Sequence, residues 1–216
     1  SEATPQFNFN ADIQKALLKN LNLLPDDIRI AGRMNSNFSG SNLENINGSI
    51  SLNDVAVSRD SIKTSVKHFS LNTKTFADGS KTILLNSDFA EGEIKGTFNY
   101  RTLPRALSEF VTSSITRDFS KVMPDTVAQN FTADITIYEP GNISRIIYPK
   151  LLLIRQSRIV ADFNSTKQLN LTATIPALTF DKYTIRESSI YATIGKESFD
   201  IQAKVDKVLN DDNQIL

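Results

Sequence analysis

The feature that most constrains this chain is a regular alternation of apolar and polar residues between Ile46 and Tyr100. Ile50 and Leu52 lie between serines and asparagine, and the same pattern returns at Ile94 and Phe98. Alternation with a period of two places one set of side chains on one face of a β-sheet. The stretch therefore predicts a meander of roughly five strands with no helix between them.

Three local signals divide this meander into strands. After Asp54 the apolar positions shift by one residue, to Val55 and Val57, which predicts a bulge or a tight bend. Asp60-Ser61 is a turn signal. Asp78-Gly79 predicts a hairpin, because residues of these two types tolerate positive φ.

The segment before the meander predicts a short strand at Phe7–Phe9, followed by a helix capped by Asn10 and ended by Pro25. Alternation over Ile28–Met34 then predicts a second strand, and 36–42 a loop. The apolar face of the expected helix consists of Ile13, Ala16, Leu17 and Leu21.

The spacing of apolar residues changes from strand to helix after Tyr100. A helix is predicted from about Pro104 to Lys121, because proline is tolerated in a first helical turn. The side chains expected to face the sheet are Leu107, Phe110, Val111 and Ile115.

The remainder of the chain again reads as strands. Asn142 is expected to cap a short helix that ends at Tyr148-Pro149, and Gly195-Lys196 predicts a hairpin. The predicted strand regions are 133–137, 154–164, 169–175, 190–194 and 199–205.

The order of these elements suggests an internal duplication. Residues 1–101 form the first β-rich repeat unit, 102–130 a linking helix and turn, and 131–216 the second β-rich repeat unit. The alternative is that unrelated β-meanders resemble one another at this level of detail. The predicted fold is thus mainly β: a curved antiparallel sheet, resembling a groove, with one amphipathic linking helix and one or two short helices.

Composition excludes several classes of function. Lys plus Arg and Asp plus Glu both number 24, so net charge gives no reason to expect binding to nucleic acid. Cysteine is absent, which excludes disulfides and cysteine metal sites. No stretch approaches the roughly 18 apolar residues expected of a membrane-spanning helix.

No motif indicates catalysis, a cofactor or a metal, and the chain is expected not to be an enzyme. His68 is the only histidine and has no neighbouring pattern of metal ligands. The carboxylate pairs Asp26-Asp27, Glu91/Glu93 and Asp211-Asp212 could in principle act as acid and base, but each is better explained as solvated surface.

Several runs resemble the C-terminal region of TamB-like proteins of Bacteroidetes, members of the AsmA-like group known as translocation and assembly modules. The resemblance covers nearly the whole chain and consists of repeat patterns, not of catalytic signatures. The runs are 23–32, 46–52, 81–96 with the following Leu103-Pro104-Arg105-Ala106-Leu107, then Ile135 to Pro149 and 157–164.

The resemblance implies a periplasmic localisation, in a longer protein anchored in the inner membrane of a Gram-negative bacterium. It implies a β-sheet curled into a long groove (a β-taco) through which phospholipids pass toward the outer membrane, or help in outer-membrane protein assembly. The implied partners are phospholipid acyl chains and an outer-membrane barrel of the Omp85 class. The chain would be an interior piece of such a protein.

The apolar strand faces leave two interpretations open, a closed core or a groove open to acyl chains, since both require a dry face. The leading hypothesis is a non-enzymatic module that binds acyl chains. The alternative is a structural or docking module whose sheet edges bind a partner by strand addition. The candidate groove-lining residues are Ile50, Leu52, Ile94, Phe98, Leu171, Ile175, Ile201 and Val205.

Overall fold

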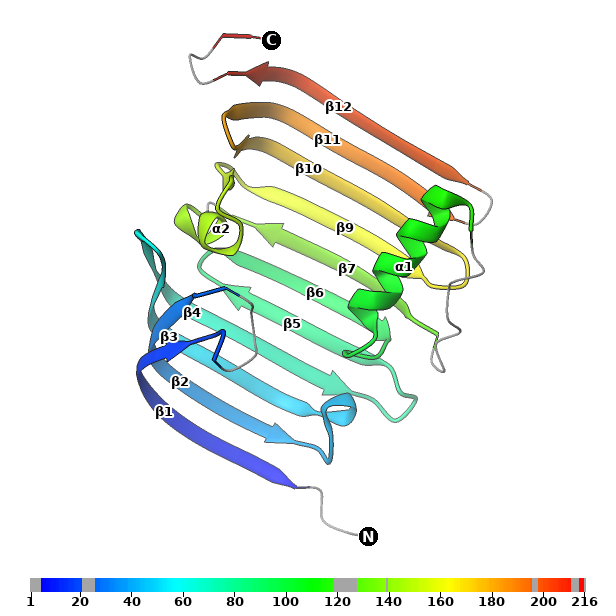
Figure 1. Ribbon diagram of the computed structural model, residues 1–216. Helices are drawn as coiled ribbons and strands as arrows, with labels where there is room; N and C mark the ends of the chain where they lie inside the picture. The colour runs from blue at the N-terminus through cyan, green and yellow to red at the C-terminus, as the bar shows by residue number, and fades with distance from the viewer. Residues whose placement is uncertain are drawn as a thin grey trace.

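The computed structural model describes residues 5–20, 26–118, 128–138, 140–195, 198–210 and 214–215. These residues form one curved antiparallel sheet of 12 strands, with β1 and β12 at opposite edges (Figure 1). Strands follow one another across the sheet almost in chain order, from β1 to β12; β8 lies off this path and pairs with β10. The predicted fold, a curved antiparallel sheet with few helices, is confirmed.

The strand bounds follow the alternating segments of the sequence. In the first half they are β1 Gln6–Leu17, β2 Arg29–Ser39, β3 Asn47–Arg59, β4 Ile62–Thr75, β5 Lys81–Ser87 and β6 Ala90–Thr97. In the second half they are β7 Asn130–Ile137, β8 Leu151–Leu153, β9 Ser157–Asn164, β10 Gln168–Phe180, β11 Tyr183–Gly195 and β12 Phe199–Leu209.

Three helical segments accompany the sheet: α1 at Leu103–Thr116, α2 at Asn142–Ile147 and the single 3-10 turn η1 at Leu43–Asn45. Pro104 lies in the first turn of α1, as predicted, and Arg117 ends the helix in a left-handed conformation with φ 57°. The predicted end of this helix at Lys121 lies outside the described residues. Both α-helices lie on the same face of the sheet, which we call the apolar face.

The helix predicted after Asn10 is wrong. Ile13 and Leu17 belong to β1, which pairs with β2 from Gln6↔Ser39 to Leu17↔Arg29. The ladder shifts register between Ile13 and Ala16, and this shift moves Ala16 onto the face occupied by Ile13. A bulged strand and a helix therefore produce the same local spacing of apolar residues. The predicted loop at 36–42 is also partly wrong, because β2 continues to Ser39.

Both turns predicted within the meander, at Asp60-Ser61 and at Asp78-Gly79, are confirmed. Asp60, at the β3–β4 turn, has φ 52°, and Gly79, at the β4–β5 turn, has φ 82°. The bend predicted at Asp54 is confirmed as well: this residue has φ 52°, and the β2–β3 ladder changes register opposite it. Leu52 and Val55 consequently face the same side, where both contribute to one cluster of apolar side chains.

The expected boundary between repeat units does not interrupt the sheet. β6 pairs with β7 along its full length, from Ala90↔Ile137 to Thr97↔Asn130. Gly96 allows this contact: a Cβ at that position would lie 2.0 Å from the carbonyl oxygen of Asn130. The expected copies also differ, since α2 of the second half has no helical counterpart at Ile13–Leu17. That the halves are duplicates stays a prediction.

Candidate functional site

The apolar face is the candidate site, because strand register joins its side chains into rows that cross the sheet. Each pair of neighbours in a row is a direct cross-strand pair. One of these rows, which we call the central row, runs from β1 to β12. Its members are Phe9, Ser36, Ile50, Leu71, Leu85, Gly92, Ile135, Ile159, Ala173, Ile190 and Ala203.

Seven of the eight predicted lining residues lie in the central row or in the rows beside it. Ile94, Leu171 and Ile201 share one adjacent row, since successive cross-strand pairs link them through Ala133, Ala161 and Ala192. Leu52 lies on the other side of the central row, as do Ile175 and Val205, which both align with Ser188.

Phe98 is the exception, and its assignment to an open groove is corrected. It is 2% exposed and lies in a closed core under α1, where its ring meets Phe131 at a centroid distance of 6.1 Å. Phe110 of α1 contacts Phe163 of β9 at 5.3 Å in this core. Helix α1 therefore covers the apolar face near one end of the strands (Figure 1).

The other end of the apolar face is partly covered by α2. Ile143 packs against Val55 and Val66, with Leu52 and Phe69 around this cluster. Arg59 holds the C-terminal end of α2, because its guanidinium donates to the carbonyl oxygens of Ile146 at 3.0 Å and Ile147 at 3.3 Å. The same guanidinium pairs with Asp26 at 2.9 Å. Cations at a helix C-terminus satisfy carbonyls that have no partner within the helix.

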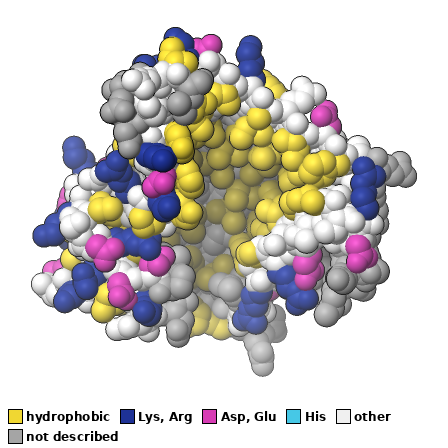
Figure 2. Space-filling view, turned by 45° about the horizontal axis from the view of Figure 1, so that its top comes forward, with side chains coloured by type: hydrophobic (Ala, Val, Ile, Leu, Met, Phe, Trp, Pro, Cys, Tyr) yellow, Lys and Arg dark blue, Asp and Glu magenta, His cyan; other side chains and the backbone are white. Residues whose placement is uncertain are grey.

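Between the two helices, no other described element lies over the apolar face. Figure 2 shows a hollow lined by hydrophobic side chains, with charged side chains along its rims. Side chains in the middle of the sheet, such as Ile50 and Ile159, are half-buried, while Phe9 of β1 is 52% and Ile201 of β12 is 49% exposed. The curved sheet thus holds an apolar surface that the described part of the chain leaves open.

A second bend, which sequence reasoning missed, prolongs this surface on the β10–β12 side. Glu187 in β11 has φ 49°, at the level of the sheet where Asp54 bends β3. Each of these carboxylates pairs with an arginine, Asp54 with Arg33 and Glu187 with Arg155 at 3.6 Å. Beyond Glu187 lies an apolar hollow of about 700 Å³ lined by Leu151, Leu178, Phe180, Tyr183, Ile185 and Val208. The sequence holds the same signal as at Asp54, because the apolar positions of β11 shift parity between Ile185 and Ile190.

A buried lysine lies on the apolar face near α1, and its charge is neutralised there. Lys81 is 6% exposed; its ammonium donates to Glu44 and to the carbonyl oxygen of Phe98, both at 2.7 Å. It also lies 4.3 Å from the ring centroid of Tyr100. Glu44 in turn accepts a hydrogen bond from the backbone of Tyr100 at 3.2 Å. Sequence reasoning did not single out this pair, although Lys81 alternates in phase with Ile83.

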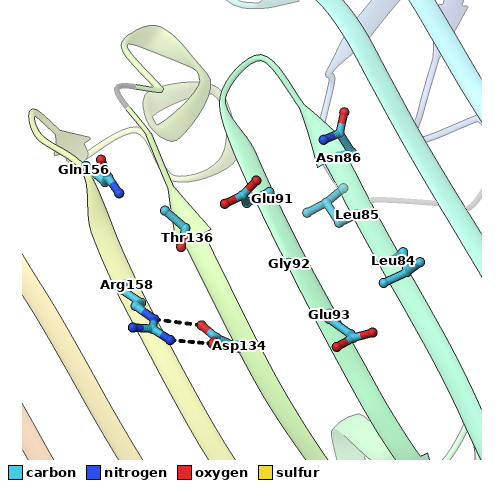
Figure 3. A pocket seen from close by; sticks show the side chains of 10 residues that line it. All are labelled: Leu84, Leu85, Asn86, Glu91, Gly92, Glu93, Asp134, Thr136, Gln156 and Arg158. Carbon is cyan, nitrogen blue, oxygen red and sulfur yellow. Dashed lines mark hydrogen bonds and ion pairs between the residues drawn. The ribbon is translucent and has the colours of Figure 1, made fainter.

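The opposite face of the sheet is polar and carries a shallow pocket of about 710 Å³ (Figure 3). In it Arg158 donates to both carboxylate oxygens of Asp134, at 2.9 and 2.6 Å, and these hydrogen bonds lower the pKa of Asp134. A hydrogen bond with Glu91 raises the pKa of Tyr138. Glu93 pairs with Lys95 at 2.7 Å, so Glu91 and Glu93 have separate partners.

The other polar candidates of the sequence are dispersed. His68 is exposed on β4 opposite Asn53. Asp26 pairs with Arg59, whereas Asp27 pairs with Lys19 at 3.5 Å. Within the part of the chain that the structure describes, no group of three or more His, Asp or Glu side chains could hold a metal ion. The pair Asp211-Asp212 lies outside the described residues.

Comparison with known proteins gives no match among family models, curated proteins or solved structures. Among the described residues, neither helix has the length and hydropathy needed to cross a membrane.

Proposed function

We propose that this chain is a non-enzymatic module that binds the acyl chains of phospholipids along its apolar face. The observation that carries the proposal is the central row, in which apolar side chains and glycine or serine follow one another across the sheet. A surface of this kind buries hydrocarbon without recognising a headgroup. Each CH₂ removed from water contributes roughly 0.8 kcal/mol, whatever its position along the surface.

The geometry also supports movement of a lipid along the face. Neighbouring strands are spaced by about 4.8 Å, so each row offers a similar contact at regular intervals. An acyl chain that shifts by one strand exchanges one apolar neighbour for another and changes its buried area little. In a longer protein with the same sheet, this surface would serve phospholipid transport and outer-membrane biogenesis in the periplasm, with an Omp85-class barrel as the partner that the sequence resemblance implies.

A pair of adjacent residues provides the experiment. Ile159 lies in the central row, whereas Val160, the next residue of β9, is 37% exposed on the polar face. Native mass spectrometry of the purified chain should show bound phospholipid. Ile159→Asp should reduce the bound fraction at least about tenfold, because a carboxylate in the row would lose water when an acyl chain covers it. Val160→Asp should leave binding unchanged.

Circular dichroism and a denaturant midpoint for each variant establish that the fold is retained. If a folded Ile159→Asp protein carries as much lipid as the wild type, the apolar face is not the binding surface. Absence of bound or added phospholipid on the wild-type chain would likewise overturn the proposal.

The alternative function, docking of a partner by strand addition, is favoured by one specific observation. β1 and β12 are the edges of the sheet, and each pairs with a strand on one side only. Ile159→Asp distinguishes the two functions, because it alters the apolar face and leaves both edges intact. It should reduce lipid binding and leave strand addition at the edges unchanged.

A further inference from the structure

Strand β12 is an edge that the described chain leaves open. All residues from Phe199 to Lys207 are exposed, and only Leu209, at the end of the strand, forms a bridge on its outer side, with Ile215. β12 contains no proline, and its side chains on the apolar face are Phe199, Ile201, Ala203 and Val205. Edges that lack proline and inward-pointing charges are templates for pairing with another strand.

The direction of the strands limits which edge β12 can accept. Eleven strands lie on the antiparallel path, an odd number, so β1 and β12 run in the same direction. Joining β12 of one copy to β1 of another would therefore create a parallel ladder within an antiparallel sheet. Two copies of β12 related by a two-fold axis perpendicular to the sheet form an antiparallel ladder and keep both apolar faces on the same side.

The side chains of β12 are also complementary to those of a second, antiparallel copy of β12. To keep both apolar faces on the same side, the two-fold axis must pass midway between the two copies of one residue, which then lie directly opposite each other. An axis at Ala203 would place Asp200 opposite Asp206, and like charges directly opposite are unfavourable. An axis at Gln202 instead places Asp200 of each copy opposite Lys204 of the other, with Phe199 opposite Val205 and Ile201 opposite Ala203.

We propose that β12 pairs with β12 of a second copy of this chain, in the register centred on Gln202. The dimer contains two symmetry-related pairs of Asp200 and Lys204 on the polar face. On the other face, the apolar rows of one copy continue into those of its partner, which doubles the length of the open surface. This interaction does not depend on lipid binding.

Sedimentation velocity over a concentration series tests the association. The wild-type chain should dimerise reversibly, and Lys204→Asp should raise the dimer dissociation constant at least about tenfold, because it places two acidic side chains opposite each other twice. The exchange Asp200→Lys/Lys204→Asp should restore dimerisation. Lys167→Asp, in the exposed turn before β10, is the matched control and should leave the dissociation constant unchanged.

Because the natural chain has no cysteine, oxidative cross-linking reports the register directly. Gln202→Cys places the two thiols in a directly opposed pair, at a Cα separation suited to a disulfide. Asp200→Cys and Lys204→Cys should form few dimers alone and an efficient heterodimer when mixed. A wild-type chain that stays monomeric throughout, or Asn10→Cys on β1 cross-linking where Gln202→Cys does not, would overturn the proposal.

Discussion

Lys81 shows how a single residue can contradict the pattern of its strand and still be accommodated. It occupies an apolar position of β5, yet burial of an unpaired ammonium is costly. Glu44, from the turn η1 far away in the sequence, supplies the opposite charge, while Phe98 and Tyr100 supply a carbonyl oxygen and an aromatic ring. Four residues thus act together where the sequence shows one lysine.

We expect Glu44→Ala to lower the free energy of unfolding by about 2 kcal/mol, since it leaves the Lys81 ammonium largely buried without its counter-charge. The control is Glu93→Ala, which removes an exposed ion pair with Lys95 and should cost less than about 0.5 kcal/mol. Urea denaturation at neutral pH measures both. Equal effects of the two substitutions would show that the Lys81–Glu44 pair contributes no more than a surface pair.

At the scale of the element, helix α1 shows which of its side chains face the sheet. Its helical spacing predicts that Leu107, Phe110 and Val111 face the sheet, and all three contribute to the core. The same reasoning placed Ile115 there, and this prediction is wrong: Ile115 is 60% exposed. Ser113 and Ser114 are buried instead, and the hydroxyl of Ser114 donates to the carbonyl oxygen of Phe110 at 2.8 Å.

Two substitutions in α1 test this orientation. Phe110→Ala should lower the free energy of unfolding by about 3–4 kcal/mol, because it removes a ring enclosed by Phe163 and other aromatic side chains. Ile115→Ala should change it by less than about 0.5 kcal/mol, as is typical of exposed positions. Chemical denaturation of both variants distinguishes them. A large loss with Ile115→Ala would mean that the last turn of the helix packs on the sheet.

At the scale of the whole molecule, one apolar face is closed in one place and open in another. Ile194 of β11 lies under α1 and is 5% exposed, whereas Ile201, on the adjacent strand of the same face, is 49% exposed. The two positions carry the same residue type in the same alternation. The placement of α1 and the position of β12 at the edge of the sheet together separate core from open surface.

A carboxylate introduced at each position measures this difference. Ile194→Asp should destabilise the chain by several kcal/mol or prevent folding, because the charge would lose its water without a partner, at a cost on the order of 3 kcal/mol. Ile201→Asp should remain folded and cooperative, with a loss below about 1 kcal/mol, because solvent reaches this edge. Thermal and urea unfolding at low protein concentration compare the two. Unfolding of Ile201→Asp would indicate that β12 belongs to a closed core.

The sequence by itself determined the secondary structure where local physics suffices. Alternation at period two defines a strand and its two faces, and a turn needs only a few residues able to adopt it, such as Asp78-Gly79. The bend at Asp54 was visible for the same reason, because it displaces the apolar positions of its own strand. The general form of the fold, a curved antiparallel sheet with an amphipathic helix, could be predicted from these signals.

Only the tertiary structure decided which strands pair, in which register, and what covers them. Ile13–Leu17 has a spacing compatible with a helix, but β2 pairs with it on both sides of the bulge and makes it a strand. Phe98 and Ile201 both occupy alternating apolar positions, and α1 encloses only the first. Hydrophobic periodicity shows that one face of a strand is apolar. Whether that face is covered by protein or stays open depends on contacts between residues far apart in the chain.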